Sequence, residues 1–413
     1  MTAVLLRNAR VFDGVNPECP EGMQVLVEGG VIREMSSQPL RTQDMQEIDV
    51  GGRTLMPGLI DAHIHAYGSD LNVQKIELAG DAYRTAYAAR MLGHALECGF
   101  TTVRDVGGGD WSLWRAIEDK LIRAPRFLYV GKFISMTGGH GDFRQAGEVS
   151  HGHGLCACDT GNAMSHIADG VDEVVKAARE ELRRGAHCIK IMSSGGVLSP
   201  TDPIWMNQYR EDEIRAIVTE TVERRTYTAA HCHPSSAIRR AVECGVRSIE
   251  HGTLIDDATA RFVAERGAFI VPTMVICFVL VELGGQSGVA PGILEKAKLV
   301  YHQALGGMES MRRAGVRIGF GTDLLGSAHV HQCREFSIRS EVFTPLEILR
   351  QATSVNAELL MQKDRLGCIK PGAHADLLVV EGDPLKDIGL LAASGAKLRL
   401  IMRAGELVRN QLS

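Results

Sequence analysis

From residue 59 onward, short apolar runs alternate with amphipathic stretches. The stretch 171–184, for example, places Val171, Val174 and Leu182 on one face and charged residues on the other, as expected for a surface helix. Strands that alternate with such helices indicate βα units and a parallel sheet, and eight units in succession predict a TIM barrel. The predicted strands are 59–63, 101–105, 127–131, 187–192, 227–231, 247–251, 268–272 and 316–321.

Both ends of the chain have a different pattern. Residues 1–57 consist of short alternating segments and turns, such as 4–11 and 23–28, and the C-terminal segments ADLLVVEG and KLRLIMRAGELV also alternate, which is typical of strands. We therefore predict an α/β protein with two parts. Residues 58–363 form a (β/α)8 barrel, and residues 1–57 with 364–413 form a small β-sandwich domain.

The composition of the chain argues against several classes of function. The 413 residues include 45 basic and 50 acidic side chains, a net charge of −5, which argues against nucleic-acid binding and against a polybasic membrane signal. The apolar segment 268–281 contains Pro272 and is too short to span a bilayer. With no secretory pattern at the N-terminus, we expect a soluble, cytoplasmic enzyme. The segment HGHGLCAC at 151–158 fits no tetrahedral zinc spacing and predicts a polar loop.

Unusual polar residues occur where the predicted strands end, which is the active-site face of a TIM barrel. Residues two apart on a strand point to the same side, so each of the motifs DAHIH and AAHCH can direct two imidazoles to one place. Buried imidazoles are costly unless something compensates them, and a metal ion is the usual compensator. The sequence therefore predicts a metal site. The residues at these strand ends are His63, His65, Lys190, His231, His233, His251 and Asp323.

Lys190, in the apolar motif CIKIM, allows two interpretations. An ammonium cannot bind a metal and is expensive to bury unpaired, so Lys190 either forms a salt bridge, most simply with Asp323, or reacts with CO₂. The resulting carbamate is an anion that could bridge two metal ions, which would then stabilise a tetrahedral intermediate.

The motifs LMPGLIDAHIH, IKIMSSGG, AAHCH, SIEHGT and GFGTDLLG resemble those of the amidohydrolase superfamily. The resemblance covers nearly the whole chain and is strongest to the branch of imidazolonepropionase-related peptidases. That branch includes Xaa-Pro dipeptidases, carboxypeptidases acting on dipeptides and N-acyl amino acids, and ochratoxin-cleaving hydrolases. The fold that the resemblance implies is a distorted TIM barrel beside a β-sandwich built from both termini.

The resemblance also implies roles for the strand-end residues. His63, His65 and Asp323 would hold the more buried of two divalent metal ions, with zinc as the expected metal. His231 and His251 would hold the other ion, and carboxylated Lys190 would bridge both. Asp323 would take a proton from the bridging water as it attacks the scissile carbonyl and pass it to the leaving amine.

Four further residues are expected to contact the substrate. His140, in TGGHG, resembles the family histidine that contacts the substrate carbonyl oxygen, although a glycine-rich loop with a solvent-exposed histidine is an equal alternative. Gly195 and Val197, in SSGGVLSP, follow the fourth strand and line the pocket unless this segment is only a turn. In relatives an aromatic hydroxyl residue usually occupies the place of His233 and helps to hold the substrate α-carboxylate.

The expected activity is hydrolysis of the amide bond of a dipeptide or an N-acyl amino acid, with release of a C-terminal amino acid such as proline. Alternatives are a cyclic-amide hydrolase of the imidazolonepropionase kind and an ochratoxin-type amide hydrolase. A mononuclear deaminase is disfavoured because HCHPSS lacks the glutamate that such enzymes use. A non-catalytic scaffold is disfavoured because all six ligands are present. We expect a homo-oligomer, as in relatives.

Overall fold

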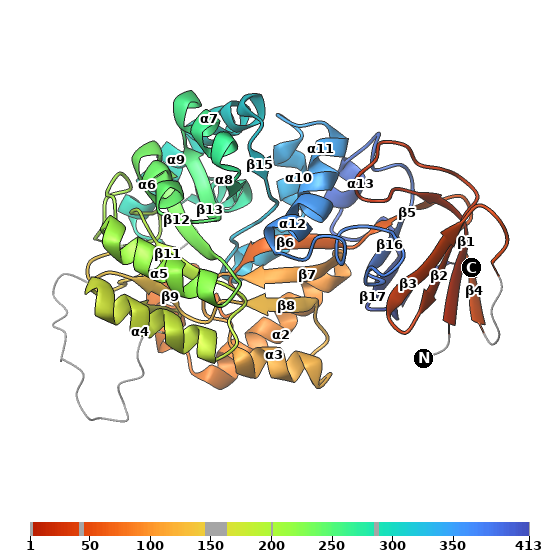
Figure 1. The fold of residues 1–413 in the computed structure, drawn as a ribbon, viewed down its shortest axis with the longest axis horizontal. Helices are drawn as coiled ribbons and strands as arrows, with labels where there is room; N and C mark the ends of the chain where they lie inside the picture. The colour runs from red at the N-terminus through yellow and green to blue at the C-terminus, as the bar shows by residue number, and fades with distance from the viewer. Residues whose placement is uncertain (1–2, 41–44, 145–162, 200, 285–288, 413) are drawn as a thin grey trace.

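The computed structural model describes residues 1–413 except 1–2, 41–44, 145–162, 200, 285–288 and 413. It consists of a barrel and, at one end of the molecule, a β domain that contains strands from both ends of the chain (Figure 1). The fold is thus the predicted one, a TIM barrel with a terminal β domain. The segment 151–158, predicted to be a polar loop, lies outside the described residues.

The terminal β domain has eight hydrogen-bonded strands, and β1 belongs to both of its halves. Residues 3–7 of β1 pair with β4 and residues 4–9 with β2, whereas Arg10 and Val11 pair with β5. Apolar side chains of the two halves, such as Val25 and Leu400, share one buried core. The strands are β1 (Ala3–Val11), β2 (Met23–Glu28), β3 (Val31–Ser36), β4 (Met45–Asp49), β5 (Thr54–Pro57), β16 (Leu377–Val380), β17 (Leu398–Arg403) and β18 (Glu406–Asn410).

The barrel strands are parallel and lie close to the predicted positions. After β15 the chain runs beside β6, where the amide of Asp323 donates to the carbonyl of His63 (2.8 Å) and closes the ring. The strands are β6 (Leu59–Ile64), β7 (Phe100–Asp105), β8 (Arg126–Tyr129), β9 (Phe133–Ser135), β11 (Ile189–Met192), β12 (Thr228–Pro234), β13 (Ser248–Leu254), β14 (Phe269–Val271) and β15 (Arg317–Ile318).

The third barrel strand differs from the prediction of one run over 127–131. It is divided into β8, which pairs with β7, and β9, which pairs with β11 and with the short β10 (Ser165–Ile167). Gly131 between them has a φ of +75°, a conformation that favours glycine. A Cβ there would also overlap the carboxylate of Glu181. The turn at Gly131 therefore divides the strand and directs β9 toward the site.

Helices surround the barrel (Figure 1). At the start of α11, Thr344 precedes Pro345 and forms a capping box with Glu347, and both features favour the beginning of a helix. The helices are α1 (Val73–Leu78), α2 (Asp81–Glu97), α3 (Trp111–Glu118), α4 (Gly170–Arg183), α5 (Glu211–Glu223), α6 (Ser235–Glu243), α7 (Asp257–Arg266), α8 (Met274–Leu283), α9 (Pro291–Ala314), α10 (Arg334–Arg339), α11 (Pro345–Arg350), α12 (Asn356–Leu359) and α13 (Gly389–Ala392).

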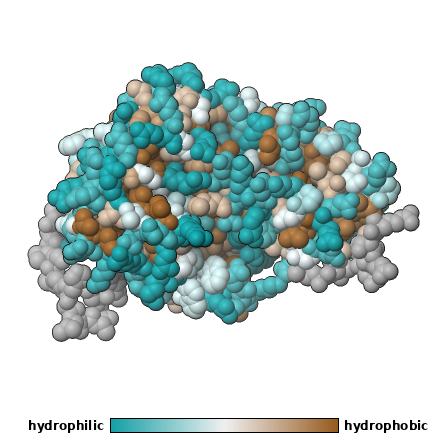
Figure 2. Space-filling model, in the orientation of Figure 1, coloured by the Kyte–Doolittle hydropathy of each residue, from teal (hydrophilic) through white to brown (hydrophobic). Residues whose placement is uncertain are grey.

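The surface in Figure 2 is mainly hydrophilic, with separate apolar patches. Over the described part of the chain, no helix combines the length and the apolarity needed to cross a membrane.

Candidate functional site

The carboxyl ends of the barrel strands bring the predicted imidazoles together. The ring centroids of His63 and His65 are 5.4 Å apart, those of His63 and His251 4.9 Å, and those of His231 and His251 4.5 Å. These rings are all buried and line one cavity with Lys190 and Asp323. Residues separated by up to 260 positions in the sequence thus form one cluster.

In each of these imidazoles, one ring nitrogen forms a hydrogen bond to another group of the protein. Nδ1 of His63 contacts Glu250 (2.8 Å), Nδ1 of His65 the carbonyl of Gly107 (2.9 Å), and Nε2 of His231 the carbonyl of Gly195 (3.2 Å). Carboxylates and carbonyls only accept hydrogen bonds, so these nitrogens carry the protons. The other nitrogen of each ring is left for the site, where it could bind a metal ion.

The remaining nitrogens fit such an ion. Nε2 of His63 is buried without a hydrogen-bond partner, and an orphaned buried polar atom is expensive. Burial holds the pKa of His231 and His251 well below its usual range, so both rings are neutral, as ligands must be. Neutral imidazoles beside a carboxylate are a donor set for a divalent transition metal, and the residues present fit one.

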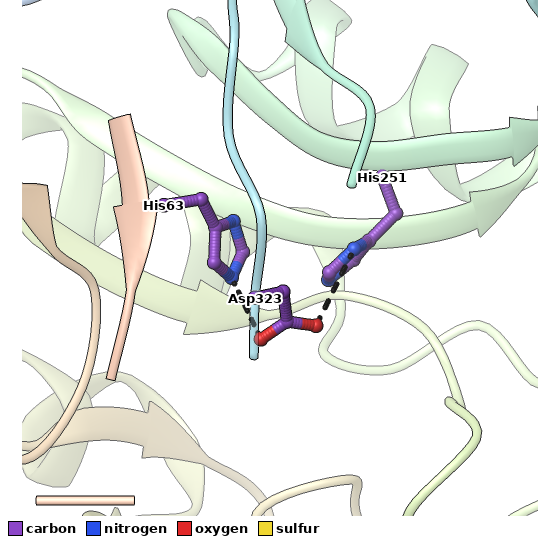
Figure 3. A group of neighbouring side chains, drawn as sticks. All are labelled: His63, His251 and Asp323. Atoms are coloured by element: carbon purple, nitrogen blue, oxygen red, sulfur yellow. Dashed lines mark ion pairs between the residues drawn. The ribbon is translucent and has the colours of Figure 1, made fainter. Parts of the chain in front are cut away.

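Asp323 lies between the rings of His63 and His251 (Figure 3). One carboxylate oxygen is 3.3 Å from Nε2 of His63 and 3.1 Å from Nε2 of His65, and the other is 4.0 Å from Nδ1 of His251. Burial alone would raise the pKa of Asp323, but His63 and His65 hold it well below its usual range. Asp323 is therefore a carboxylate, able to bind a cation or accept a proton.

Two of these residues have unusual backbone conformations. The φ of His251 is +74° and that of Asp323 is +55°, and such values are uncommon outside glycine. Strain of this kind persists only where the surrounding structure enforces it, and it is concentrated at functional sites. It supports a functional role for both residues, and it could not be inferred from the sequence.

Lys190 is 1% exposed and has no ion pair with Asp323. The structure therefore does not contain the simpler of the two predicted alternatives. Burial lowers the pKa of Lys190, although Glu250 and Asp323 oppose this effect. A lowered pKa favours the neutral amine, which is the form that adds to CO₂.

A buried ion pair supports the cluster, and the sequence analysis did not identify it. Arg104 on β7 donates to both carboxylate oxygens of Glu250 (2.7 and 2.9 Å) and to the carbonyl of Ala62 (2.6 Å). Burial alone would raise the pKa of Glu250, but Arg104 and His63 hold it at about 2. Glu250 directly precedes His251 in SIEHGT, and that adjacency is the only sequence signal for its role.

Replacing Arg104 by Met is expected to lower the free energy of unfolding by about 3 kcal/mol, because Glu250 would be left as an unpaired buried charge. Urea denaturation of the purified protein measures this loss. Arg115→Met is the matched control, because Arg115 pairs with Asp119 on the exposed surface of α3, where a pair contributes about 0.5 kcal/mol. Equal losses in the two variants would contradict a supporting role for the buried pair.

His140 is fixed in the cavity rather than exposed to solvent. Its ring stacks on that of His231 with centroids 4.2 Å apart, and its Nδ1 is 2.7 Å from Oγ of Ser199. A side chain at position 196 would overlap the His140 ring, so Gly196 is required for this approach. His140 is thus placed beside a candidate metal ligand.

The other predicted contact residues lie nearby. His233 lines the cavity, and its Nδ1 is 2.7 Å from Oγ1 of Thr253. Burial lowers its pKa to about 3, so the ring is neutral. Val197 also lines the cavity, whereas Gly195 contacts the site through its carbonyl, at His231.

Comparison with known proteins agrees with this geometry. A solved amidohydrolase structure is 45% identical, with full coverage of both chains and a TM-score of 0.96. A prolidase complexed with N-methylphosphonate-L-proline is 44% identical over 99% of this chain and 100% of its own, with a TM-score of 0.95. Ochratoxinase of Aspergillus niger is 32% identical over 345 residues, 81% of this chain and 71% of its own. The amidohydrolase family model matches residues 54–408. The chain therefore belongs to the amidohydrolase family, whose members are hydrolases acting on C–N bonds.

Proposed function

We propose that this protein is a binuclear metal-dependent hydrolase that cleaves the amide bond of N-acyl amino acids or dipeptides and releases a C-terminal amino acid such as proline. The observation that carries the proposal is the buried cluster in which every candidate imidazole is oriented by one protein partner and leaves its other nitrogen toward the site. The similarity to a prolidase supports the substrate class.

The ligand assignment follows the same contacts. His63, His65 and Asp323 would hold one divalent ion, His231 and His251 the other, and carboxylated Lys190 would bind both, with zinc as the proposed metal. Bound metal ions would polarise the scissile carbonyl and lower the pKa of the attacking water.

The protein's own residues would perform the proton transfers and hold the substrate. Asp323 is ionised beside His63 and His65, so it can accept the proton of the attacking water and deliver it to the leaving nitrogen. His140, held by Ser199, would donate a hydrogen bond to the carbonyl oxygen as negative charge develops there. His233 would donate its free Nε2–H to the carboxylate of the leaving amino acid.

The direct test is amino-acid release from a panel of dipeptides and N-acyl amino acids. The protein is supplied with zinc and bicarbonate, and its metal content is measured on the same sample. Release with about two metal ions per chain is expected. Two ions without release, or release only from cyclic amides or esters, would contradict the proposed substrate class but not the metal site.

His233→Tyr is expected to change the preference among leaving amino acids by about tenfold in the ratio of their kcat/KM values, because it replaces the imidazole N–H at the proposed carboxylate position by a phenol O–H on a larger ring. Steady-state kinetics on two substrates that differ only in the leaving amino acid measures this change. His331→Tyr makes the same exchange at a residue outside the cavity and is expected to leave the ratio unchanged. An unchanged ratio in both variants would remove His233 from the specificity pocket.

A further inference from the structure

The cavity at the cluster is apolar beyond the metal-ligand candidates. Its walls away from the histidines consist of large apolar side chains from several segments. These include Phe133, Phe143, Met164, Ile276 and Leu280.

Carboxylates are scarce in this cavity. Among the lining residues that the structure describes, Asp323 is the only acidic one, and it already contacts His63 and His65. Another carboxylate, Asp202, is 1% exposed and is not a lining residue. Its Oδ2 accepts from the amides of Gly196 and Gln208 and is 3.6 Å from Nδ1 of His140, whereas its Oδ1 is buried without a hydrogen-bond partner. The described lining therefore contains no second carboxylate that could pair with a cationic group of a substrate.

The lining of the cavity extends from His233 to Val73. His233 is on β12, the fifth barrel strand, whereas Val73 follows β6, the first, so the two residues lie across the barrel from each other. Val73, Phe143 and Leu198 also line a second cavity beside α9. If His233 holds the leaving amino acid, the acyl group extends past these three side chains.

The second cavity also lacks a charged side chain that is free to bind substrate. Its only charged residue among those described is Lys296. Lys296 Nζ donates to the carbonyls of Gly196 (3.0 Å), Ser199 (3.0 Å) and Asp202 (2.6 Å). An ammonium has three donors, so all of them are used to hold the loop. The second cavity therefore provides no cation to bind a substrate carboxylate. This is consistent with the carboxylate of the leaving amino acid binding at His233 instead.

We propose, on the basis of the function proposed above, that the natural substrate carries an uncharged, apolar acyl group and is an N-acyl amino acid rather than a free dipeptide. A free dipeptide has an ammonium next to its scissile carbonyl. In this cavity the ammonium would be buried without a counter-ion, which is costly, and bound metal ions would repel it.

Matched pairs of substrates test this inference. Each pair has one leaving amino acid and differs only in the α-amino group, as in L-leucyl-L-proline and 4-methylpentanoyl-L-proline. The compound without the amine is expected to have a kcat/KM at least about tenfold higher. Equal values, or faster cleavage of the dipeptide, would overturn the inference while leaving the amidase function intact. Cleavage of neither compound in any pair would overturn both.

A binding measurement separates affinity from turnover. Calorimetry with the metal-loaded Asp323→Asn variant, whose turnover is expected to be slow, compares the Kd values of the two compounds. The compound without the amine is expected to bind about tenfold more tightly or better. Equal Kd values would show that the cavity does not discriminate against the ammonium, and would overturn the inference.

Leu198→Glu offers a counter-ion at a half-buried position that both cavities share. It is expected to raise the kcat/KM of the dipeptide relative to its partner by about tenfold, because the ammonium then has a carboxylate to pair with. Leu198→Gln has nearly the same shape without the charge and is the control, with no change in the ratio expected. An equal change in both variants would show that shape, not charge, sets the preference and would overturn the inference.

Discussion

Replacing Asp323 by Asn is expected to lower kcat by about 10³-fold or more, with the fold retained. Asn has the same shape as Asp and can remain between His63 and His65, so the packing of the cluster changes little. It carries no negative charge, and it cannot accept the proton of the attacking water. The proposed proton transfer to the leaving nitrogen is therefore lost.

Kinetics and metal content of the same Asp323→Asn sample check this expectation. Asp110→Asn is the matched control, because Asp110 caps α3 through two backbone amides and Asn caps a helix equally well. We expect its kcat to be unchanged. If Asp323→Asn kept full turnover with its metal ions bound, the carboxylate would not be the proton carrier.

The position of the cluster could be predicted because it depends on short-range patterns. Apolar runs predict the strands, and the polar residues at their ends, such as His63 and Asp323, must lie on one face of a barrel. The structure confirms the fold and brings the predicted side chains into one cavity. The roles of the individual side chains in catalysis stay predictions.

The side chains that hold the cluster in place could not be predicted, because they act through contacts between residues far apart in the sequence. Arg104 and Glu250 are 146 residues apart, and nothing near either residue in the sequence indicates the pair. The division of the third strand likewise depends on the packing of Glu181 against Gly131. The same holds for Lys296, which reaches the loop after β11 from a helix that begins about ninety residues further along the chain.

Lys190→Ala is expected to have the largest effect of the variants considered, a loss of kcat/KM of about 10⁴-fold together with reduced metal content. The carbamate is the one proposed ligand shared by both metal ions, so its removal weakens both sites. Without this anion between them, the two cations would also repel each other more strongly. Steady-state kinetics and elemental analysis of the purified variant measure the two losses. Lys190→Arg keeps a positive charge but cannot form a carbamate, and we expect it to be as inactive as Lys190→Ala.

Chemical rescue distinguishes a carbamate from an ammonium at this position. Truncation to Ala leaves a space that a small carboxylic acid such as propionate can enter, and its carboxylate can take the place of the carbamate as an anionic ligand. Propionate is therefore expected to restore part of the metal content and activity of Lys190→Ala, whereas ethylammonium is not. Rescue by ethylammonium alone would mean that Lys190 acts as a cation. In that case the protein would hold its metal ions with the histidines and Asp323, and the bridging anion would have to come from elsewhere.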